Sequence, residues 1–214
     1  ENGWSIISDT AWPGYERIPR LIMLGYTRLL DEIEEPFDTI FVQGGVGGLL
    51  CAMASWCAFH RSDQPRVIAV EPTSAACLQA SARAGRPVAV TGPLTTTMAG
   101  LRNREVSPPA FEALLPIVDA FMSIDDLWAH EAMRRFARPA EGDPAIDAGA
   151  SGSAALGGLL ALCREPSLAP ARSQLGLNRD SRVLVLVSEG VTDPALWASH
   201  VRTHPEQPGG TFRC

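Results

Sequence analysis

A glycine-rich loop is the part of this sequence best suited to bind a ligand. It lies between two apolar segments and reads Gln43-Gly44-Gly45-Val46-Gly47-Gly48. Glycines tolerate positive φ and let the backbone come close to a ligand. The free N–H groups at the start of a following helix favour an anion such as a phosphate. The loop has no lysine, serine or threonine, unlike the GxxxxGK[ST] nucleotide loop, and its glycine spacing is not GxGxxG. The sequence therefore predicts a phosphate site made by backbone groups, and the alternative is a tight turn without a ligand.

A serine near the end of the sequence is the second candidate. Ser188 follows a strongly apolar run and begins the motif Ser188-Glu189-Gly190. In a parallel sheet the carboxyl ends of the strands share one rim, and ligands bind there. We therefore expect Ser188 to lie on the same rim as the glycine loop, where its hydroxyl could hydrogen-bond a heterocyclic nitrogen without forcing that nitrogen to be protonated. An ordinary turn serine is the alternative.

The charged residues limit the possible chemistry. All 18 lysine-plus-arginine positions are arginine, so the 214 residues contain no lysine, and the formal net charge is −6. Such a balance argues against nucleic acid or an anionic membrane as a partner. No apolar run reaches the roughly 18 residues that a membrane-spanning helix needs. The five cysteines show no CxxC or Cys/His spacing, so no metal site is assigned.

The elements that must position these residues alternate between strands and helices. Apolar, β-branched runs are typical of strands, and they occur at Trp4–Ser8, Thr39–Val42, Arg66–Val70, Ala120–Ile124 and Arg182–Val187. Helical spacing or turn signals predict helices over 18–35, Leu49–Phe59, Thr73–Ala84, Pro109–Leu115, Leu127–Phe136, Ser151–Cys163 and after Pro194. This order predicts an α/β fold with a mostly parallel sheet covered by helices on both faces.

The length and composition fit one domain. Hydrophobic residues make up 46% and charged residues 20% of the chain, so a buried core is feasible. We expect residues 1–204 to form this domain and residues 205–214 to form a flexible tail. Turn-forming residues predict exposed loops at Gly85–Gly92 and Arg138–Ala148.

Short motifs recur in one order along nearly the whole chain, and together they are far more specific than any one of them. They are Asn2-Gly3-Trp4, Asp9-Thr10-Ala11-Trp12-Pro13-Gly14-Tyr15, Ile18-Pro19, Met23-Leu24-Gly25-Tyr26, Gln43–Gly48, Val70-Glu71-Pro72, Thr97-Met98-Ala99-Gly100-Leu101, Ser151-Gly152, Leu156-Gly157, Ser188-Glu189-Gly190 and Thr192-Asp193. The set resembles the diaminopropionate ammonia-lyase family. That family lies within the fold-type-II enzymes that use pyridoxal 5'-phosphate (PLP), the tryptophan synthase β-like group.

The resemblance implies roles for the candidate residues. The family's glycine loop holds the PLP phosphate, which maps to Gly44, Gly45, Val46, Gly47 and Gly48. Its late-strand serine meets the pyridine nitrogen, which maps to Ser188, and Ala99 and Gly100 would lie against the ring. Asp9 would act as acid/base toward the substrate, and its alternative is a solvated turn or helix-capping aspartate.

The resemblance also implies an activity. The reaction would be α,β-elimination on 2,3-diaminopropionate, a small amino acid, to give pyruvate and ammonia. A cytoplasmic homodimer is expected for such an enzyme. Two alternatives remain, which are a threonine or serine dehydratase-like enzyme of the same fold and a noncatalytic remnant that pairs with another chain.

Two departures from the family affect this expectation. Ala150 stands where the family usually has an acidic residue before its Ser-Gly pair. The family binds PLP as a Schiff base on a lysine in an N-terminal half, and this sequence has no lysine. We therefore expect a C-terminal portion of the PLP-binding large domain, without its N-terminal part. Such a portion would hold PLP noncovalently, would be inactive alone, and would pair with the missing half.

Overall fold

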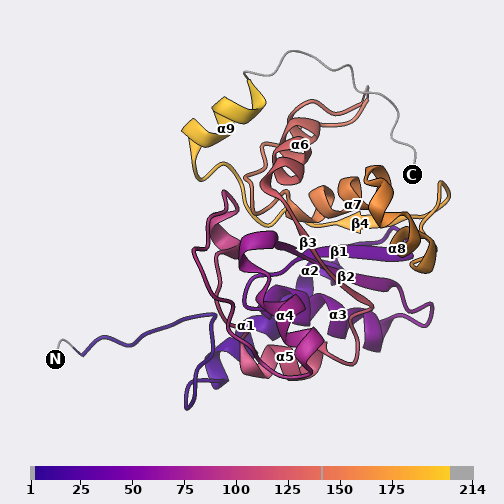
Figure 1. Ribbon diagram of the computed structural model, residues 1–214. Coiled ribbons are helices and arrows are strands. Elements are labelled where there is room, and N and C mark those ends of the chain that lie inside the picture. Colours follow the sequence, from indigo (N-terminus) through magenta and orange to yellow (C-terminus); the bar gives the residue numbers. More distant parts are fainter. Residues whose placement is uncertain (1–2, 141, 203–214) are drawn as a thin grey trace.

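A parallel sheet forms the centre of the protein. The computed structural model describes residues 3–140 and 142–202, and it contains a four-stranded parallel sheet with the order β3-β2-β1-β4 (Figure 1). The strands are β1 (Thr39–Gln43), β2 (Arg66–Pro72), β3 (Ala120–Ile124) and β4 (Val183–Val185). All five residues of β1 are buried, because this strand is central in a sheet that is covered on both faces. The four strands predicted after residue 38 are confirmed, although β4 is shorter than expected.

Helices cover both faces of this sheet (Figure 1). On one face lie α1 (Arg17–Tyr26), α2 (Arg28–Asp31), α3 (Gly48–His60), α4 (Cys77–Ala84) and α5 (Pro108–Leu114). On the other face lie α6 (Asp126–Ala137), α7 (Ala154–Arg164), α8 (Ala169–Gln174) and α9 (Pro194–Val201). The predicted α/β fold with a covered parallel sheet is therefore confirmed.

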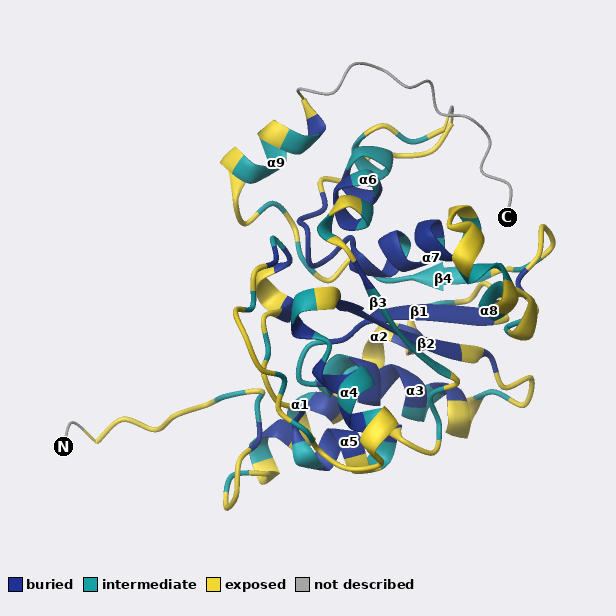
Figure 2. Ribbon diagram, in the orientation of Figure 1, coloured by how far each residue is buried: buried dark blue, intermediate teal, exposed yellow. Residues whose placement is uncertain are grey.

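The core consists of two layers divided by the sheet. Successive side chains of a strand point to opposite faces, so Ile40 and Val42 pack with the α1–α5 layer while Phe41 packs with the α6–α9 layer. All three side chains are fully buried. Figure 2 shows the same division, with buried residues on the sheet and on the helix faces that meet it.

Small residues let α7 pack closely against the sheet and a neighbouring helix. A Cβ added to Gly158 would lie 2.6 Å from Cγ2 of Val70 in β2. A Cβ added to Gly157 would lie 3.0 Å from the carbonyl oxygen of Trp128 in α6. The predicted small-residue helix is thus explained by close packing on both sides.

Several predicted elements were wrong in extent or type. Residues 4–8 form no strand and their side chains are largely exposed. Residues 4–7 are exposed and residue 8 is partly buried. The described sheet contains no strand that pairs with this apolar run. The helix expected over 18–35 ends at Tyr26, and α2 follows it. The Thr27 hydroxyl donates to the Leu24 carbonyl at 2.7 Å at the break between them.

Two further helices begin later than predicted because carboxylates bind the N–H groups near their starts. Glu71 accepts hydrogen bonds from the N–H groups of Leu78 and Gln79, both at 2.7 Å, and α4 begins only at Cys77 after a short 3-10 turn at Thr73–Ala75. Glu189 accepts from the N–H group of Ser151 at 2.8 Å, and α7 begins at Ala154.

The remaining expectations concern membrane-spanning helices, surface loops and the C-terminal tail. No helix within residues 3–140 or 142–202 is long and apolar enough to cross a membrane. The loops expected at Gly85–Gly92 and Arg138–Ala148 carry no helix or strand where the structure describes them. The tail expected at residues 205–214 lies outside the described residues. The helix α8, which follows a short 3-10 turn at Pro166–Leu168, was not predicted from the sequence.

Candidate active site

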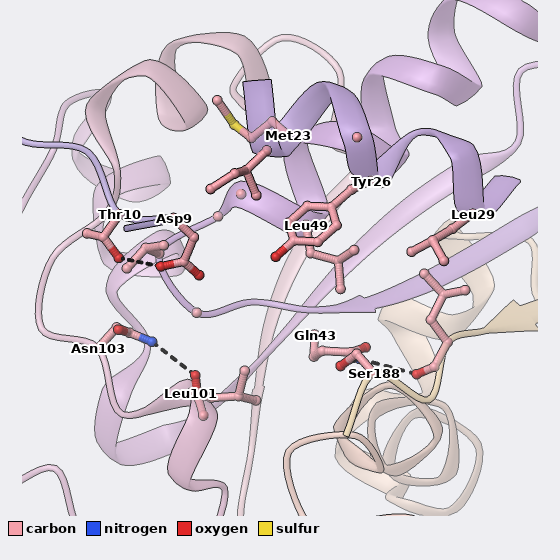
Figure 3. Close-up of a pocket in the computed structure, with 18 of the residues that line it drawn as sticks. Asp9, Thr10, Met23, Tyr26, Leu29, Gln43, Leu49, Leu101, Asn103 and Ser188 are labelled. Carbon is pink, nitrogen blue, oxygen red and sulfur yellow. Dashed lines mark hydrogen bonds between the residues drawn. The ribbon is translucent and has the colours of Figure 1, made fainter. Parts of the chain in front are cut away.

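A cavity of about 720 Å³ opens at the carboxyl ends of β1 and β4. Its walls come from the segment before α1, from α1 and α2, from the glycine loop, from the 3-10 turn at Ala99–Leu101 and from the residues after β4. Figure 3 shows these walls, with Asp9 on one side of the cavity and Ser188 on the other. The parallel register of β1 with β4 brings the glycine loop and Ser188 to one rim, which confirms that expectation.

Three of the loop's four glycines, which are Gly44, Gly45 and Gly47, have too little space or too unusual a backbone conformation for a side chain. Gly47 has φ 103° and is the N-cap of α3, whose first turn has no side-chain cap. A Cβ added to Gly45 would lie 2.8 Å from Nδ2 of Asn103, and one added to Gly44 would lie 2.7 Å from Cδ1 of Leu78. Since no side chain caps α3, its first N–H groups remain available to an anion.

A buried carboxyl group supports the loop from below. Glu71 is fully buried, and its side chain lies beside Gly44, whose added Cβ would be 3.0 Å from Glu71 Cγ. Burial raises the pKa of Glu71 to about 7, although its hydrogen bonds from Leu78 and Gln79 act to lower it. Glu71 thus ties the start of α4 to the loop. Sequence reasoning had noted it only as part of a motif.

Ser188 is held by a residue that sequence reasoning did not single out. The Gln43 side-chain amide donates to Ser188 Oγ and to the Leu186 carbonyl oxygen, the latter at 3.2 Å. Gln43 is only 4% exposed, yet it lines the cavity. Its Oε1 atom is buried and has no partner among the described residues. The position of Gln43 as the last residue before the glycines was the available signal.

Asp9 lines the cavity from an exposed segment. The Thr10 hydroxyl donates to Asp9 Oδ1 at 3.2 Å. The helix-capping alternative for Asp9 is wrong, because α1 begins at Arg17 and its N-cap is Glu16. The role of Asp9 as acid/base toward a substrate stays a prediction.

The structure separates the two residues expected to lie against a ring. Gly100 lines the main cavity, whereas Ala99 lines a second cavity of about 130 Å³ together with Ala150 and Glu189. Gly44 also does not line the main cavity, whereas Gly45, Val46, Gly47 and Gly48 all do. The binding roles of Ala99 and Gly44 stay predictions.

Glu189 connects the strand end to the Gly100 turn. Its carboxylate accepts from Ser151 N at 2.8 Å, Gly152 N at 3.2 Å and Thr192 Oγ1 at 2.8 Å. Ser151 Oγ in turn accepts from Gly100 N at 3.0 Å. Ala150 is buried among these groups, so a charge is supplied beside it by Glu189 rather than by its own side chain. Sequence reasoning had not assigned this link.

The described histidines lie away from the main cavity. The His130 ring stacks on His200 at 3.6 Å between centroids, and His130 Nε2 lies 2.9 Å from Thr97 Oγ1. Burial, with a smaller effect of nearby His200, lowers the pKa of His130 to about 4. Within the described residues, no group of three or more His, Cys, Asp or Glu side chains could hold a metal ion.

A rim of parallel strands that carries a glycine loop, a helix N-terminus and a serine is shared with a known group of proteins. The chain matches the family model described as pyridoxal-phosphate dependent enzyme over residues 2–189. The chain belongs to the pyridoxal-phosphate-dependent enzyme family. PLP is therefore its family's cofactor, as the motifs predicted.

Curated relatives and solved structures agree with this assignment. The chain is 36% identical over 201 residues to diaminopropionate ammonia-lyase of Escherichia coli (strain K12), which covers 90% of this chain and 50% of the relative. It is 34% identical over 207 residues to the Salmonella typhimurium enzyme of the same name, covering 91% of this chain and 51% of the relative. The chain thus spans about half the length of the curated relatives it matches, as a portion of the family's sequence would.

A solved structure extends the likeness to the fold. The crystal structure of the Escherichia coli diaminopropionate ammonia lyase in complex with an aminoacrylate-PLP azomethine reaction intermediate superposes with a TM-score of 0.83 at 33% identity. The match covers 93% of this chain and 52% of that chain. The resemblance to the diaminopropionate ammonia-lyases is confirmed.

The described residues fit part of this cofactor. Gly45 and Gly47 keep the loop backbone free of side chains, and the uncapped N-terminus of α3 suits a phosphate. Ser188 offers a hydroxyl on the same cavity. The amine that the family uses is not supplied by these residues, since the 214 residues contain no lysine.

Proposed function

We propose that this chain supplies the phosphate- and ring-binding part of a PLP-dependent ammonia-lyase. The proposed reaction is α,β-elimination on 2,3-diaminopropionate to give pyruvate and ammonia. The observation that carries the proposal is one cavity lined by the glycine loop, Ser188 and Asp9, which come from three distant parts of the sequence.

Each wall of the cavity has a separate task in this proposal. The backbone N–H groups of Gly45–Gly48, at the positive end of the α3 dipole, bind the cofactor's phosphate. Ser188 hydrogen-bonds the ring nitrogen. When bound, the cofactor supplies an electron sink for the electron pair of the substrate's α C–H bond. Asp9, across the cavity from Ser188, moves a proton at the substrate as the β-amino group leaves (Figure 3).

The proposal requires an amine from outside these 214 residues. We propose that it comes from a lysine-bearing segment or partner chain that closes the cavity. Pairing of this kind, a homodimeric assembly and a cytoplasmic location belong to the same proposal. The half-length coverage of the curated relatives supports it.

The first test measures cofactor binding by the chain as it is. Equilibrium dialysis should show noncovalent PLP binding that competes with inorganic phosphate. Borohydride reduction followed by peptide mass mapping should place PLP on no residue of this chain. When a lysine-bearing partner segment is added, the same reduction should place PLP on that segment's lysine.

The second test measures the reaction of the completed enzyme. Ammonia and pyruvate should form faster from 2,3-diaminopropionate than from serine. Asp9→Asn should lower kcat, whereas the control Glu16→Gln, at an exposed acid outside the cavity, should not. Faster turnover of serine would replace the proposal with a dehydratase. Absence of phosphate-competed PLP binding would refute the phosphate-binding role itself.

A further inference from the structure

The amide of Gln43 has a defined orientation at the end of β1. An amide presents an NH2 group with two donors on one side and an oxygen acceptor on the other. The Leu186 carbonyl oxygen, 3.2 Å away, can only accept, so the NH2 group must face it. The reversed amide would place two oxygens against each other. The neighbouring backbone therefore settles which end of the Gln43 side chain faces Ser188.

This orientation determines how Ser188 can hydrogen-bond. The same NH2 group donates to Ser188 Oγ, so this oxygen already accepts one hydrogen bond. A serine hydroxyl has one hydrogen to donate. Among the described residues, the hydrogen bonds of the Ser188 side chain include no acceptor for that hydrogen. Its donor capacity is therefore open to a ligand in the cavity that both residues line.

The remaining amide atom indicates that Gln43 is not placed for stability alone. Its Oε1 is buried without a partner, in a residue that is 4% exposed. A buried acceptor without a partner lowers stability, and such atoms in native proteins call for an explanation. An amide that only filled space at this position would carry that penalty for no gain.

We infer that Gln43 is a positioning residue that makes Ser188 a hydrogen-bond donor, so that the site favours a ligand whose ring nitrogen is unprotonated. The amide NH2 behind Ser188 Oγ is the positive end of a dipole and disfavours a cationic N–H in front of it. The inference rests on the proposed function, in which Ser188 meets the ring nitrogen of PLP. It adds the residue that decides in which direction that hydrogen bond runs.

Other charged groups around the cavity act on the same nitrogen and must be held constant. The titratable side chains that line the cavity are Asp9, Tyr26, Arg28 and Glu32. None of them is changed in the variants below. A difference between variants therefore reports Gln43 and Ser188.

The test uses a probe that needs no lysine. The probe is 4'-deoxypyridoxine 5'-phosphate labelled with 15N in the ring, which has the phosphate and the ring but no aldehyde. Titration of the bound probe by 15N NMR gives the protonation constant of its ring nitrogen in the full chain. In parallel, dialysis measures the affinity for inorganic phosphate, which a purely structural role of Gln43 would also change.

The variants separate the two residues. Gln43→Met keeps the side-chain length and removes the donors, and we expect it to raise the protonation constant about three- to tenfold, the effect of roughly one hydrogen bond. Ser188→Ala should raise it similarly. Gln43→Met added to Ser188→Ala should then cause no further change. The affinity for inorganic phosphate should stay the same throughout.

A second substitution keeps the test decisive if Gln43→Met does not fold. Gln43→Glu preserves size and can accept the Ser188 hydroxyl hydrogen, which reverses the hydrogen bond and should raise the protonation constant. In the Ser188→Ala background only the effect of the added charge should remain. Thermal melting shows which variants fold.

Three results would overturn the inference. If the probe binds but its protonation constant is the same in the unchanged chain and in the Gln43 variants, Gln43 does not orient Ser188. If Gln43→Met acts equally with and without Ser188, its effect does not pass through the serine. If the probe does not bind at all, the proposed function fails and this inference fails with it.

Discussion

Replacement of Gly47 by alanine tests whether the loop conformation is as specific as the structure indicates. Gly47 has φ 103°, a region where a side chain costs about 1–2 kcal/mol. An added Cβ would also lie 3.1 Å from Leu114 Cδ1 and 3.2 Å from Leu78 Cδ2. Crowding of this kind in a packed region costs about 1–3 kcal/mol. The two effects together predict that Gly47→Ala lowers the free energy of unfolding by about 2–5 kcal/mol.

A matched glycine separates strain from crowding. Gly85 has φ 65° at the C-terminus of α4, and an added Cβ there would meet nothing within 4 Å. Gly85→Ala should therefore cost about 1 kcal/mol, from the backbone conformation alone. The two variants differ in whether the added methyl group meets its surroundings, and Gly47 also lines the proposed phosphate site.

Urea denaturation of the three proteins provides the measurement. With equal m-values, the midpoint should fall clearly more for Gly47→Ala than for Gly85→Ala. For a chain of this size, each 1 kcal/mol lowers Tm by roughly 2–4 °C. Dialysis should show weakened PLP binding only for Gly47→Ala. A loss of stability in Gly47→Ala no greater than in Gly85→Ala would refute the reasoning about crowding at the loop.

Three further predictions concern buried groups. Burial raises the pKa of Glu71 from 4.5 to about 7. Its contribution to stability is therefore fully present below pH 4.5 and is lost as pH rises through 7, by about 3 kcal/mol. Urea denaturation from pH 4.5 to 8 should show this loss of stability, and the Glu71→Gln variant should not show it. The pKa of His130 is lowered from 6.5 to about 4, so its contribution to stability is present above pH 6.5 and is lost as pH falls through 4. Between pH 7 and pH 4.5, the melting temperature should fall less in His130→Gln than in the unchanged chain. An equal fall would contradict the lowered pKa. Gly158→Ala should lower the free energy of unfolding by about 1–3 kcal/mol, since the added Cβ would lie 2.6 Å from Val70 Cγ2. The control Gly25→Ala, where an added Cβ in α1 meets nothing within 4 Å, should not lower it. Equal denaturation midpoints for the two variants would contradict close packing at Gly158.

The fold could be predicted largely because its two central strands are mostly apolar and buried. Every residue of Thr39–Gln43 and Arg66–Pro72 except Arg66 is buried, so these strands lack the apolar/polar alternation of a surface strand. The run at residues 4–8 has a similar composition but no neighbouring strand. Strand propensity shows that a segment can pair, whereas the availability of a partner depends on the whole chain.

Helix boundaries were less predictable because distant side chains set them. The start of α4 depends on Glu71, which accepts a hydrogen bond from the N–H group of Leu78, seven residues later. The turn before α7 depends on Glu189, which accepts a hydrogen bond from the N–H group of Ser151, 38 residues earlier. Local patterns contain no information on a capping group that arrives from another part of the chain.

The sequence alone determined the parallel sheet, the glycine loop at a strand end, the family's cofactor and the absence of lysine among these residues. Only the tertiary structure decided which side chains share the cavity. Gln43 and Ser188 are 145 residues apart, and they meet because β1 and β4 are neighbours in the sheet. Likewise Gly100 faces the main cavity while adjacent Ala99 faces the smaller one. The physical reason is that spacing along the chain fixes local conformation, whereas the direction of a hydrogen bond depends on which atoms the packing brings within reach.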